Sequence, residues 1–127
     1  MEYNWDTKTI LVVEDEPVNY LFIEKILKPT HAIVLRAENG NEAVDMVLNN
    51  KEIDIVLMDI YMPGMDGFEA SYEIKTKKPN MPVIAQTFYE SHIEKEQLDK
   101  ADFNGFIKKP ININKLLVVL DKYLKMA

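Results

Sequence analysis

The feature that most constrains the fold is an alternation of short apolar runs with longer segments of helical periodicity. The short runs are rich in β-branched residues and apolar at consecutive positions, which is typical of strands buried on both faces. They are Ile10–Val13, Ala32–Leu35, Ile55–Met58, Val83–Ala85 and Phe106–Ile107. Alternating strands and helices predict right-handed crossovers and an α/β fold with a five-stranded parallel sheet. About five helices are expected, on both faces of that sheet.

The segments between the strands carry helix-period apolar faces and helix-end signals. The predicted faces are Leu21, Ile23, Ile26 and Leu27; Ala43, Val44, Val47 and Leu48; and Leu116, Leu117, Leu120, Tyr123 and Leu124. Pro17 fits a first helical turn, and Asn41 is expected to cap the helix after the Asn39-Gly40 turn. Pro79 is expected to end another helix. A further helix is predicted near residues 91–102, where Ser91 and Glu94 have capping-box spacing.

Length and composition exclude several classes of protein. The 127 residues suffice for one domain, expected over 1–127 with its core at about 9–125 and a short lead-in over 1–8. A net charge of -6 argues against nucleic acid as a partner. With no cysteine there is no disulfide framework, Cys-ligated zinc or thiol nucleophile. The sequence shows no apolar run of membrane-spanning length and no signal peptide, so no membrane association and a cytoplasmic location are expected.

Polar side chains follow four of the five predicted strands. The first strand is followed by Glu14-Asp15-Glu16, the third by Asp59, the fourth by Gln86-Thr87 and the fifth by Lys108-Lys109-Pro110. In a parallel sheet these carboxyl ends share one edge, and open α/β sheets bind ligands in the crevice outside that edge. Topology alone therefore predicts that two acidic clusters, a hydroxyl and a lysine converge.

The predicted cluster has the chemistry of a phosphoryl-transfer site. Glu14, Asp15 and Asp59 would repel one another without a counter-ion, and carboxylate oxygens are ligands that Mg²⁺ prefers. Lys109 and Thr87 would add a positive charge and a hydroxyl donor, which suit a transferring phosphoryl group. An aspartate there can itself accept the group. Taken alone, Asp59 would be interpreted as a helix cap or turn residue, and Lys109 as a surface lysine. Only their convergence with the other strand ends favours a functional site.

The chain resembles the receiver domain of two-component response regulators over about residues 9–125. The motifs that carry the resemblance are Ile10-Leu-Val-Val-Glu-Asp15, Asp54-Ile-Val-Leu-Met-Asp-Ile-Tyr-Met-Pro-Gly-Met-Asp-Gly67, Thr87 and Phe106-Ile-Lys-Lys-Pro110. The stretches around Pro17 and Ile111, and a lead-in with Trp5, look most like receivers of hybrid histidine kinases, so the chain is expected to be cut from a longer protein. The resemblance implies a flavodoxin-like three-layer sandwich.

The resemblance also implies residue roles. Asp59 matches the phosphoacceptor. Asp15 matches the direct metal ligand, Glu14 matches the acidic neighbour that acts through metal-bound water, and the Tyr61 backbone carbonyl matches a third ligand. Lys109 matches the lysine that pairs with the acceptor. Thr87 matches the switch hydroxyl and Phe106 the switch aromatic. Phe106 could also be simply a core aromatic. The peptide bond before Pro110 is expected to be cis.

As a consequence of this resemblance, a phosphohistidine on a histidine kinase or histidine phosphotransfer domain is the expected donor, with Mg²⁺ as cofactor. The domain is not expected to be a classical enzyme, although it would catalyse its own phosphorylation and slow dephosphorylation. A phosphorylation-dependent dimer stays open. Phe88 departs from the family pattern, which has a small residue there. Tyr61 and Tyr89 are bulky neighbours of the site, expected to shield the phosphoryl group or to anchor a partner.

Three alternatives remain at the level of the sequence. A flavin-binding module would need a phosphate cradle after the first strand, where Glu14-Asp15-Glu16 repels phosphate. An aspartate-nucleophile phosphatase would carry its nucleophile after the first strand, whereas Asp59 follows the third. A signalling-inactive receiver that acts as a docking module is disfavoured by the presence of Asp59, Thr87 and Lys109.

Overall fold

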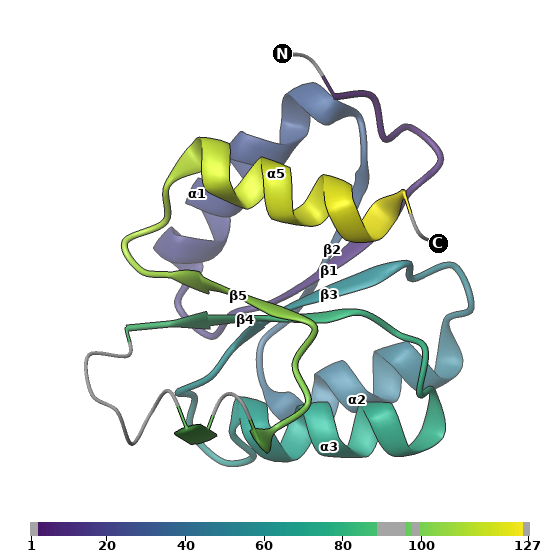
Figure 1. Ribbon diagram of the computed structural model, residues 1–127, viewed down its shortest axis with the longest axis vertical. Helices are drawn as coiled ribbons and strands as arrows, with labels where there is room; N and C mark the ends of the chain where they lie inside the picture. Colours follow the sequence, from purple (N-terminus) through teal and green to yellow (C-terminus); the bar gives the residue numbers. More distant parts are fainter. Residues whose placement is uncertain (1–2, 89–95, 98–99, 126–127) are drawn as a thin grey trace.

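The structure is a computed structural model that describes residues 3–88, 96–97 and 100–125. A five-stranded, all-parallel sheet has the order β2-β1-β3-β4-β5 (Figure 1). The strands are β1 (Thr9–Val13), β2 (Ile33–Ala37), β3 (Ile55–Asp59), β4 (Val83–Thr87) and β5 (Gly105–Lys108). The helices whose two ends both lie in the described residues are α1 (Pro17–Leu27), α2 (Gly40–Asn49), α3 (Gly67–Lys77) and α5 (Ile113–Leu124), with a 3₁₀ turn η1 (Lys28–Thr30).

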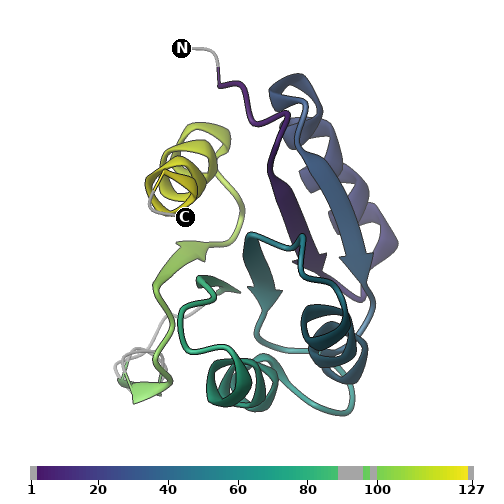
Figure 2. The ribbon, with the colours of Figure 1, turned by 90° about the vertical axis from the view of Figure 1, so that its right-hand side faces the viewer.

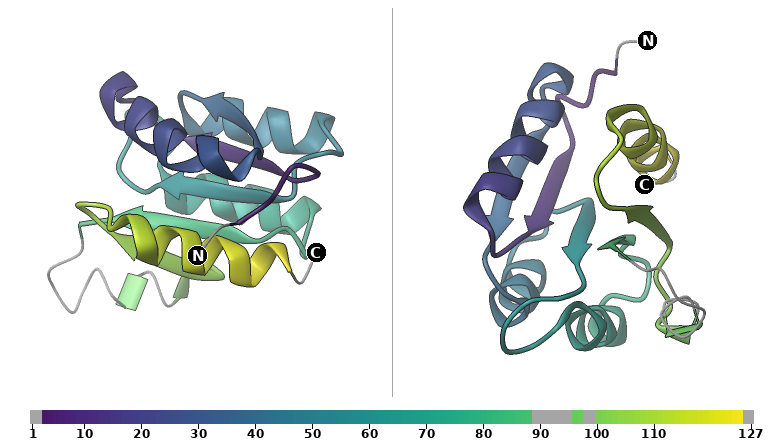
Figure 3. Two further views of the ribbon diagram at one scale, coloured as in Figure 1. Left: turned by 90° about the horizontal axis from the view of Figure 1, so that it is seen from above. Right: turned by 90° about the vertical axis from the view of Figure 1, so that its left-hand side faces the viewer.

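The helices cover the sheet from both sides, as predicted. Helices α1 and α5 lie on one face, and α2 and α3 on the other (Figures 2 and 3). Alternate strand residues point to opposite faces, so the central strands β1 and β3 contribute to two apolar cores. The core under α1 and α5 includes Ile10, Val12, Ile23, Leu27, Leu57, Ile84, Leu116 and Leu120. The core under α2 and α3 includes Leu11, Val13, Val47, Val56, Met58, Ile74 and Val83.

The order of the strands positions the ligand site. Strand β1 pairs with β2 on one side and with β3 on the other, so the chain reverses its direction of winding between β1 and β3. In open α/β sheets, the crevice outside the carboxyl ends of the strands at such a reversal is where ligands bind. The loops that follow β1 and β3 therefore flank the expected crevice.

The sequence pattern predicted that every strand is buried on both faces, and this prediction is wrong for the two edge strands. Ile33 of β2 is 53% exposed, and Phe106 of β5 is 36% exposed. β2 and β5 end the sheet, so each has a neighbouring strand on one side only, and the helices cover them less completely. Leu21 and Leu48, placed on the buried faces of their helices, are likewise exposed, at 51% and 39%.

The helix ends follow the predicted signals with one correction. Pro17 opens α1 and α3 ends at Lys77, before Pro79, as predicted. Helix α2 is capped by Asn39, whose side chain accepts from the Glu42 amide at 2.8 Å, and not by Asn41. Both asparagines are good cap residues, and Asn39 takes the role because its backbone is extended while Gly40 is already helical.

The lead-in packs against the domain. Trp5 is 5% exposed, its amide donates to the Thr30 carbonyl at 2.7 Å, and its indole donates to Asp121 of α5 at 3.3 Å. These contacts join the start of the chain to the end of α5. The predicted helix near residues 91–102 lies mostly outside the described residues; positions 96, 97 and 100 are helical. Among the described helices, none has both the length and the apolar character needed to cross a membrane.

Candidate functional site

Three carboxylates meet at the carboxyl ends of β1 and β3. Val13 of β1 pairs with Met58 of β3, so the next residues, Glu14 and Asp59, lie side by side across the two strands. One carboxylate oxygen from each of Glu14, Asp15 and Asp59 lies within 4.8 Å of the others. Glu14 and Asp59 are buried, at 1% and 5% exposure, and Asp15 is half-buried. The donor set is all oxygen and strongly acidic, which fits Mg²⁺.

Lys109 supplies the positive charge of the site from the connection between β5 and α5. Its Nζ lies 3.1 Å from Asp59 Oδ1 and 3.7 Å from Glu14 Oε1, and its side chain is only 11% exposed. The backbone amide of Lys109 donates to the Thr87 carbonyl at 2.7 Å, which joins the ends of β4 and β5. The bond to Pro110 is cis, as expected. Lys109 balances one of the three carboxylates and leaves the cluster with an excess of negative charge.

The surroundings of Glu14 change its acidity. Burial, and secondly the negative charge of Asp59, raise the pKa of Glu14 to about 7. Its carboxylate accepts hydrogen bonds from the Asn19 side chain and from the Glu16 amide, the latter at 3.2 Å. The role of Asn19 was not predicted, although its place in the first turn of α1 brings it back towards the end of β1. The Glu14 carboxylate is therefore held by two hydrogen bonds and by the charge of Lys109.

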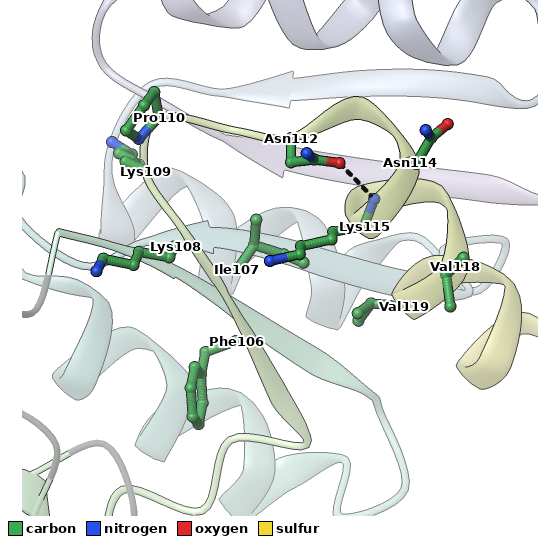
Figure 4. A pocket seen from close by; sticks show the side chains of 10 residues that line it. All are labelled: Phe106, Ile107, Lys108, Lys109, Pro110, Asn112, Asn114, Lys115, Val118 and Val119. Carbon is green, nitrogen blue, oxygen red and sulfur yellow. Dashed lines mark hydrogen bonds between the residues drawn. The ribbon is translucent and has the colours of Figure 1, made fainter.

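The predicted switch residues lie on the neighbouring strands. Thr87 ends β4, is 2% exposed and pairs in register with Lys108. Phe106 lies on β5 opposite Ala85, and its ring points away from α5 (Figure 4). Its carbon atoms help to line a cavity of about 620 Å³ between β5 and α5, which Val118 and Val119 also line. The structure thus places Thr87 at the edge of the site, on β4, and Phe106 on β5, the next strand and the edge of the sheet.

The mouth of the site has an apolar rim. A second cavity, of about 720 Å³, is lined by the acidic cluster together with Val18, Phe22, Phe88 and Ile111. Phe88 is 57% exposed, and the Lys109 ammonium lies 5.4 Å from the centre of its ring. Tyr61 is 54% exposed. Tyr89 lies outside the described residues, and the Tyr61 carbonyl stays a predicted metal ligand.

Gln86 is a second residue whose position the sequence did not explain. It is fully buried beside Asp59 in the sheet register, and both polar atoms of its amide lack a hydrogen-bond partner within the part of the chain that the structure describes. It lies on the same face as Ile84, which belongs to the core under α1 and α5. Its place at the end of a strand was predicted. The sequence pattern does not show that the side chain of a glutamine at such a position is buried.

Fold and site together define a flavodoxin-like domain whose ligand cleft is acidic and is also lined by the half-buried Lys109. The family model "Response regulator receiver domain" matches residues 10–121. The chain therefore belongs to the receiver domains of two-component signalling systems. Such a domain is a signalling module and not a classical enzyme. The predicted family and fold are both confirmed.

Relatives and solved structures agree with this assignment. The autoinducer 1 sensor kinase/phosphatase LuxN of Vibrio campbellii is 32% identical over 98% of this chain, but the match spans only 14% of that protein. Two-component response regulator 24 of Arabidopsis thaliana is 33% identical over 90% of this chain and 82% of its own length. The chain thus covers a small part of the sensor kinases and most of the plant regulator.

Two similar solved structures are receiver domains of histidine kinases. One, from sensor histidine kinase PA1611 of Pseudomonas aeruginosa, has a magnesium ion in its active-site cleft; it is 30% identical, with a TM-score of 0.85 over 93% of this chain and 98% of that one. The other, from Syntrophus aciditrophicus, is 27% identical, with a TM-score of 0.88 over 94% of this chain and 92% of that one.

Proposed function

We propose that this receiver domain accepts a phosphoryl group on Asp59 from a phosphohistidine of a histidine kinase or histidine phosphotransfer domain. The observation that carries the proposal is the part-buried ion pair of Asp59 with Lys109 inside a cluster of three carboxylates. A carboxylate that lines a cleft beside a half-buried cation has both a nucleophilic oxygen and a donor ready for the incoming phosphoryl oxygens.

The chemistry of the transfer follows from these groups. An Asp59 carboxylate oxygen attacks phosphorus, and the bond from phosphorus to the donor's imidazole nitrogen breaks. The nitrogen keeps the electron pair and regains a proton. Lys109 turns from the carboxylate towards a phosphoryl oxygen, and Thr87 donates to another. Water later attacks phosphorus, the bond from phosphorus to the Asp59 oxygen breaks, and inorganic phosphate leaves with the carboxylate restored; the domain is proposed to catalyse this slow dephosphorylation itself.

Magnesium is the proposed cofactor, because the donor set is acidic and made of oxygen. Asp15 and Asp59, with the Tyr61 carbonyl, are proposed to hold it directly, and Glu14 through a bound water. When bound, the ion neutralises the charge that the carboxylates and the phosphoryl group bring together. Burial raises the pKa of Glu14 to about 7, and the negative charge of Asp59 is the second cause.

A helical or loop partner is proposed to dock on the apolar rim of the cleft. Val18 and Phe22 of α1 are 73% and 43% exposed, and Phe88 is 57% exposed; all three line the cavity that contains Asp59. A donor histidine has to reach Asp59, so its protein must cover these side chains. The partner is proposed to be cytoplasmic, with this domain. A dimer formed after phosphorylation is compatible with these roles.

The output of phosphorylation is proposed to be a change at the surface around β5. The phosphoryl group adds about -1.5 to -2 charges and three acceptor oxygens. If Thr87 moves towards them, its space becomes open to Phe106, whose ring is 36% exposed in this structure. Phe106 has no hydroxyl, so its inward state gains packing without a new hydrogen bond. The ring and the adjoining cavity beside α5 would then present a different surface to partners.

The test is labelling by a small acyl-phosphate donor in Mg²⁺, read by intact mass. Wild type should gain one phosphoryl mass and Asp59→Asn none. Asp66→Asn is the matched control, because Asp66 caps α3 in the same segment and asparagine caps equally well. Equal labelling of wild type and Asp59→Asn would refute the assignment. No labelling of wild type, with partner binding retained, would instead favour the docking module that carries no phosphoryl group.

A further inference from the structure

Arg36 of β2 holds the backbone of the acidic loop. Its Nε donates to the carbonyl of Glu14 at 3.2 Å, and its Nη2 donates to the carbonyl of Asp15 at 3.4 Å. One planar guanidinium thus bridges the carbonyl groups of two consecutive residues, the ones that carry two of the acidic side chains. The neighbouring backbone adds a third link, because the Glu14 amide donates to the Ala37 carbonyl at 3.0 Å.

The guanidinium is itself held in place. Its central carbon lies 5.0 Å from the centre of the Tyr20 ring of α1. The side chain of Arg36 is 24% exposed, and its remaining nitrogen lies 3.6 Å from the carboxylate of Glu38, which is 63% exposed. An ion pair at so exposed a carboxylate contributes little. The contacts that define the position of Arg36 are therefore the Tyr20 ring and the two loop carbonyls.

We propose that Arg36 is a positioning residue for the magnesium site, acting through the loop that carries Glu14 and Asp15; this inference rests on the proposed function. Arg36 touches no carboxylate of the cluster that the structure describes, but it fixes the peptide units from which two of those carboxylates extend. A loop already held in one conformation loses less freedom when the ion binds. Groups that orient metal ligands in this way typically contribute about 10–100-fold in affinity.

The two effects of Arg36 on a cation have opposite signs, and this makes the proposal testable. As a positive charge near the site, Arg36 repels Mg²⁺, so charge alone predicts that its removal tightens binding. Through its hydrogen bonds to the two loop carbonyls, Arg36 favours Mg²⁺ binding, so removal of Arg36 should weaken Mg²⁺ binding. Lysine keeps the charge but lacks the rigid planar fork whose Nε and Nη2 donate to the two carbonyls from fixed positions. Arg36→Lys therefore loses the paired hydrogen bonds to the loop and keeps the charge that repels Mg²⁺, whereas Arg36→Met loses both the hydrogen bonds and the charge.

The experiment is calorimetric titration of the whole chain with Mg²⁺, beside thermal unfolding of each variant in EDTA. Arg36→Lys should weaken Mg²⁺ binding about tenfold, and Arg36→Met should weaken it less. Val34→Ala is the control, because Val34 lies on the same strand and the same face but packs against the core and away from the loop. It should lower the unfolding temperature and leave Mg²⁺ affinity unchanged.

Wild-type affinity in Arg36→Lys, or tighter binding in Arg36→Met, would overturn the proposal. Loss of affinity in Val34→Ala equal to that in Arg36→Lys would also overturn it, since the effect would then follow general stability. These outcomes differ from a failure of the proposed function. If wild type does not bind Mg²⁺ at all, the magnesium site itself is wrong; if wild type binds and the Arg36 variants bind equally, only the role of Arg36 is wrong.

Discussion

Replacing Asp15 by asparagine should make the metal-free domain more stable than wild type. In Mg²⁺ the same variant should be less stable than wild type. The reason is the carboxylate cluster, in which oxygens of Asp15, Glu14 and Asp59 lie within 4.8 Å of one another. Asparagine keeps nearly the same shape and removes one of the repelling charges. The same change removes a proposed direct ligand, so the two conditions should give opposite results.

The magnitude follows from the distances. Two unit charges 4.8 Å apart repel by about 3 kcal/mol at an effective dielectric constant of ~20. Lys109 lies 3.1 Å from Asp59 and offsets much of that repulsion, and Asp15 is half-buried, so solvent screens it further. A net gain of about 1 kcal/mol remains, or a rise in unfolding temperature of roughly 3–5 °C for a domain of this size. Ligand present at ~100 times its dissociation constant adds about 2.7 kcal/mol to wild type.

The assay is thermal unfolding of wild type and Asp15→Asn in EDTA and in saturating Mg²⁺. Asp45→Asn is the control for net charge, because Asp45 is exposed on α2, outside the acidic cluster that the structure describes. The order of stability should reverse between the two buffers for Asp15→Asn, and Asp45→Asn should follow wild type in both. If Asp15→Asn is less stable than wild type in EDTA, repulsion does not dominate this cluster and the reasoning is refuted.

Two further predictions concern acidity and the switch. In EDTA, the free energy of unfolding should fall as pH rises from about 5 to about 7, since the folded protein favours neutral Glu14, whose pKa is raised from 4.5 to about 7. Glu14→Gln should remove most of that slope, and an unchanged slope would contradict the assignment. Phosphorylation should shift amide resonances at Phe106 and along α5 near Val118; shifts limited to the residues around Asp59 would contradict a propagated switch.

Much of the site was predictable because it depends on topology alone. Parallel strands align their carboxyl ends at one edge of the sheet, so Glu14, Asp59, Thr87 and Lys109 were expected at that edge once the runs before them were recognised as strands. The strand order β1-β3-β4-β5 then makes these strand ends neighbours. The structure brings these residues together as predicted. The central segment around Asp59 then made the receiver family recognisable, and the family model confirms it.

What was missed depends on packing between segments. The order of strands in the sheet decides which strands lie at its edges, and no local pattern marks Ile33 as exposed. Asn39 and Asn41 offer the same cap chemistry, and only backbone conformation separates them. Arg36 and Asn19 reach the acidic loop from a neighbouring strand and from the first turn of α1. Periodicity assigns such polar residues to an element but does not say which loop they contact.

The most direct test of the central claim is chemical location of the acyl phosphate. Borohydride reduces an aspartyl phosphate to homoserine, so wild-type protein labelled with an acyl-phosphate donor in Mg²⁺ and then reduced can be mapped by peptide mass spectrometry. We predict homoserine at position 59 and an unmodified Asp54 and Asp66 in the same region of the sequence. Homoserine at another carboxylate, or a stable phosphate on a hydroxyl or histidine with Asp59 intact, would contradict the account.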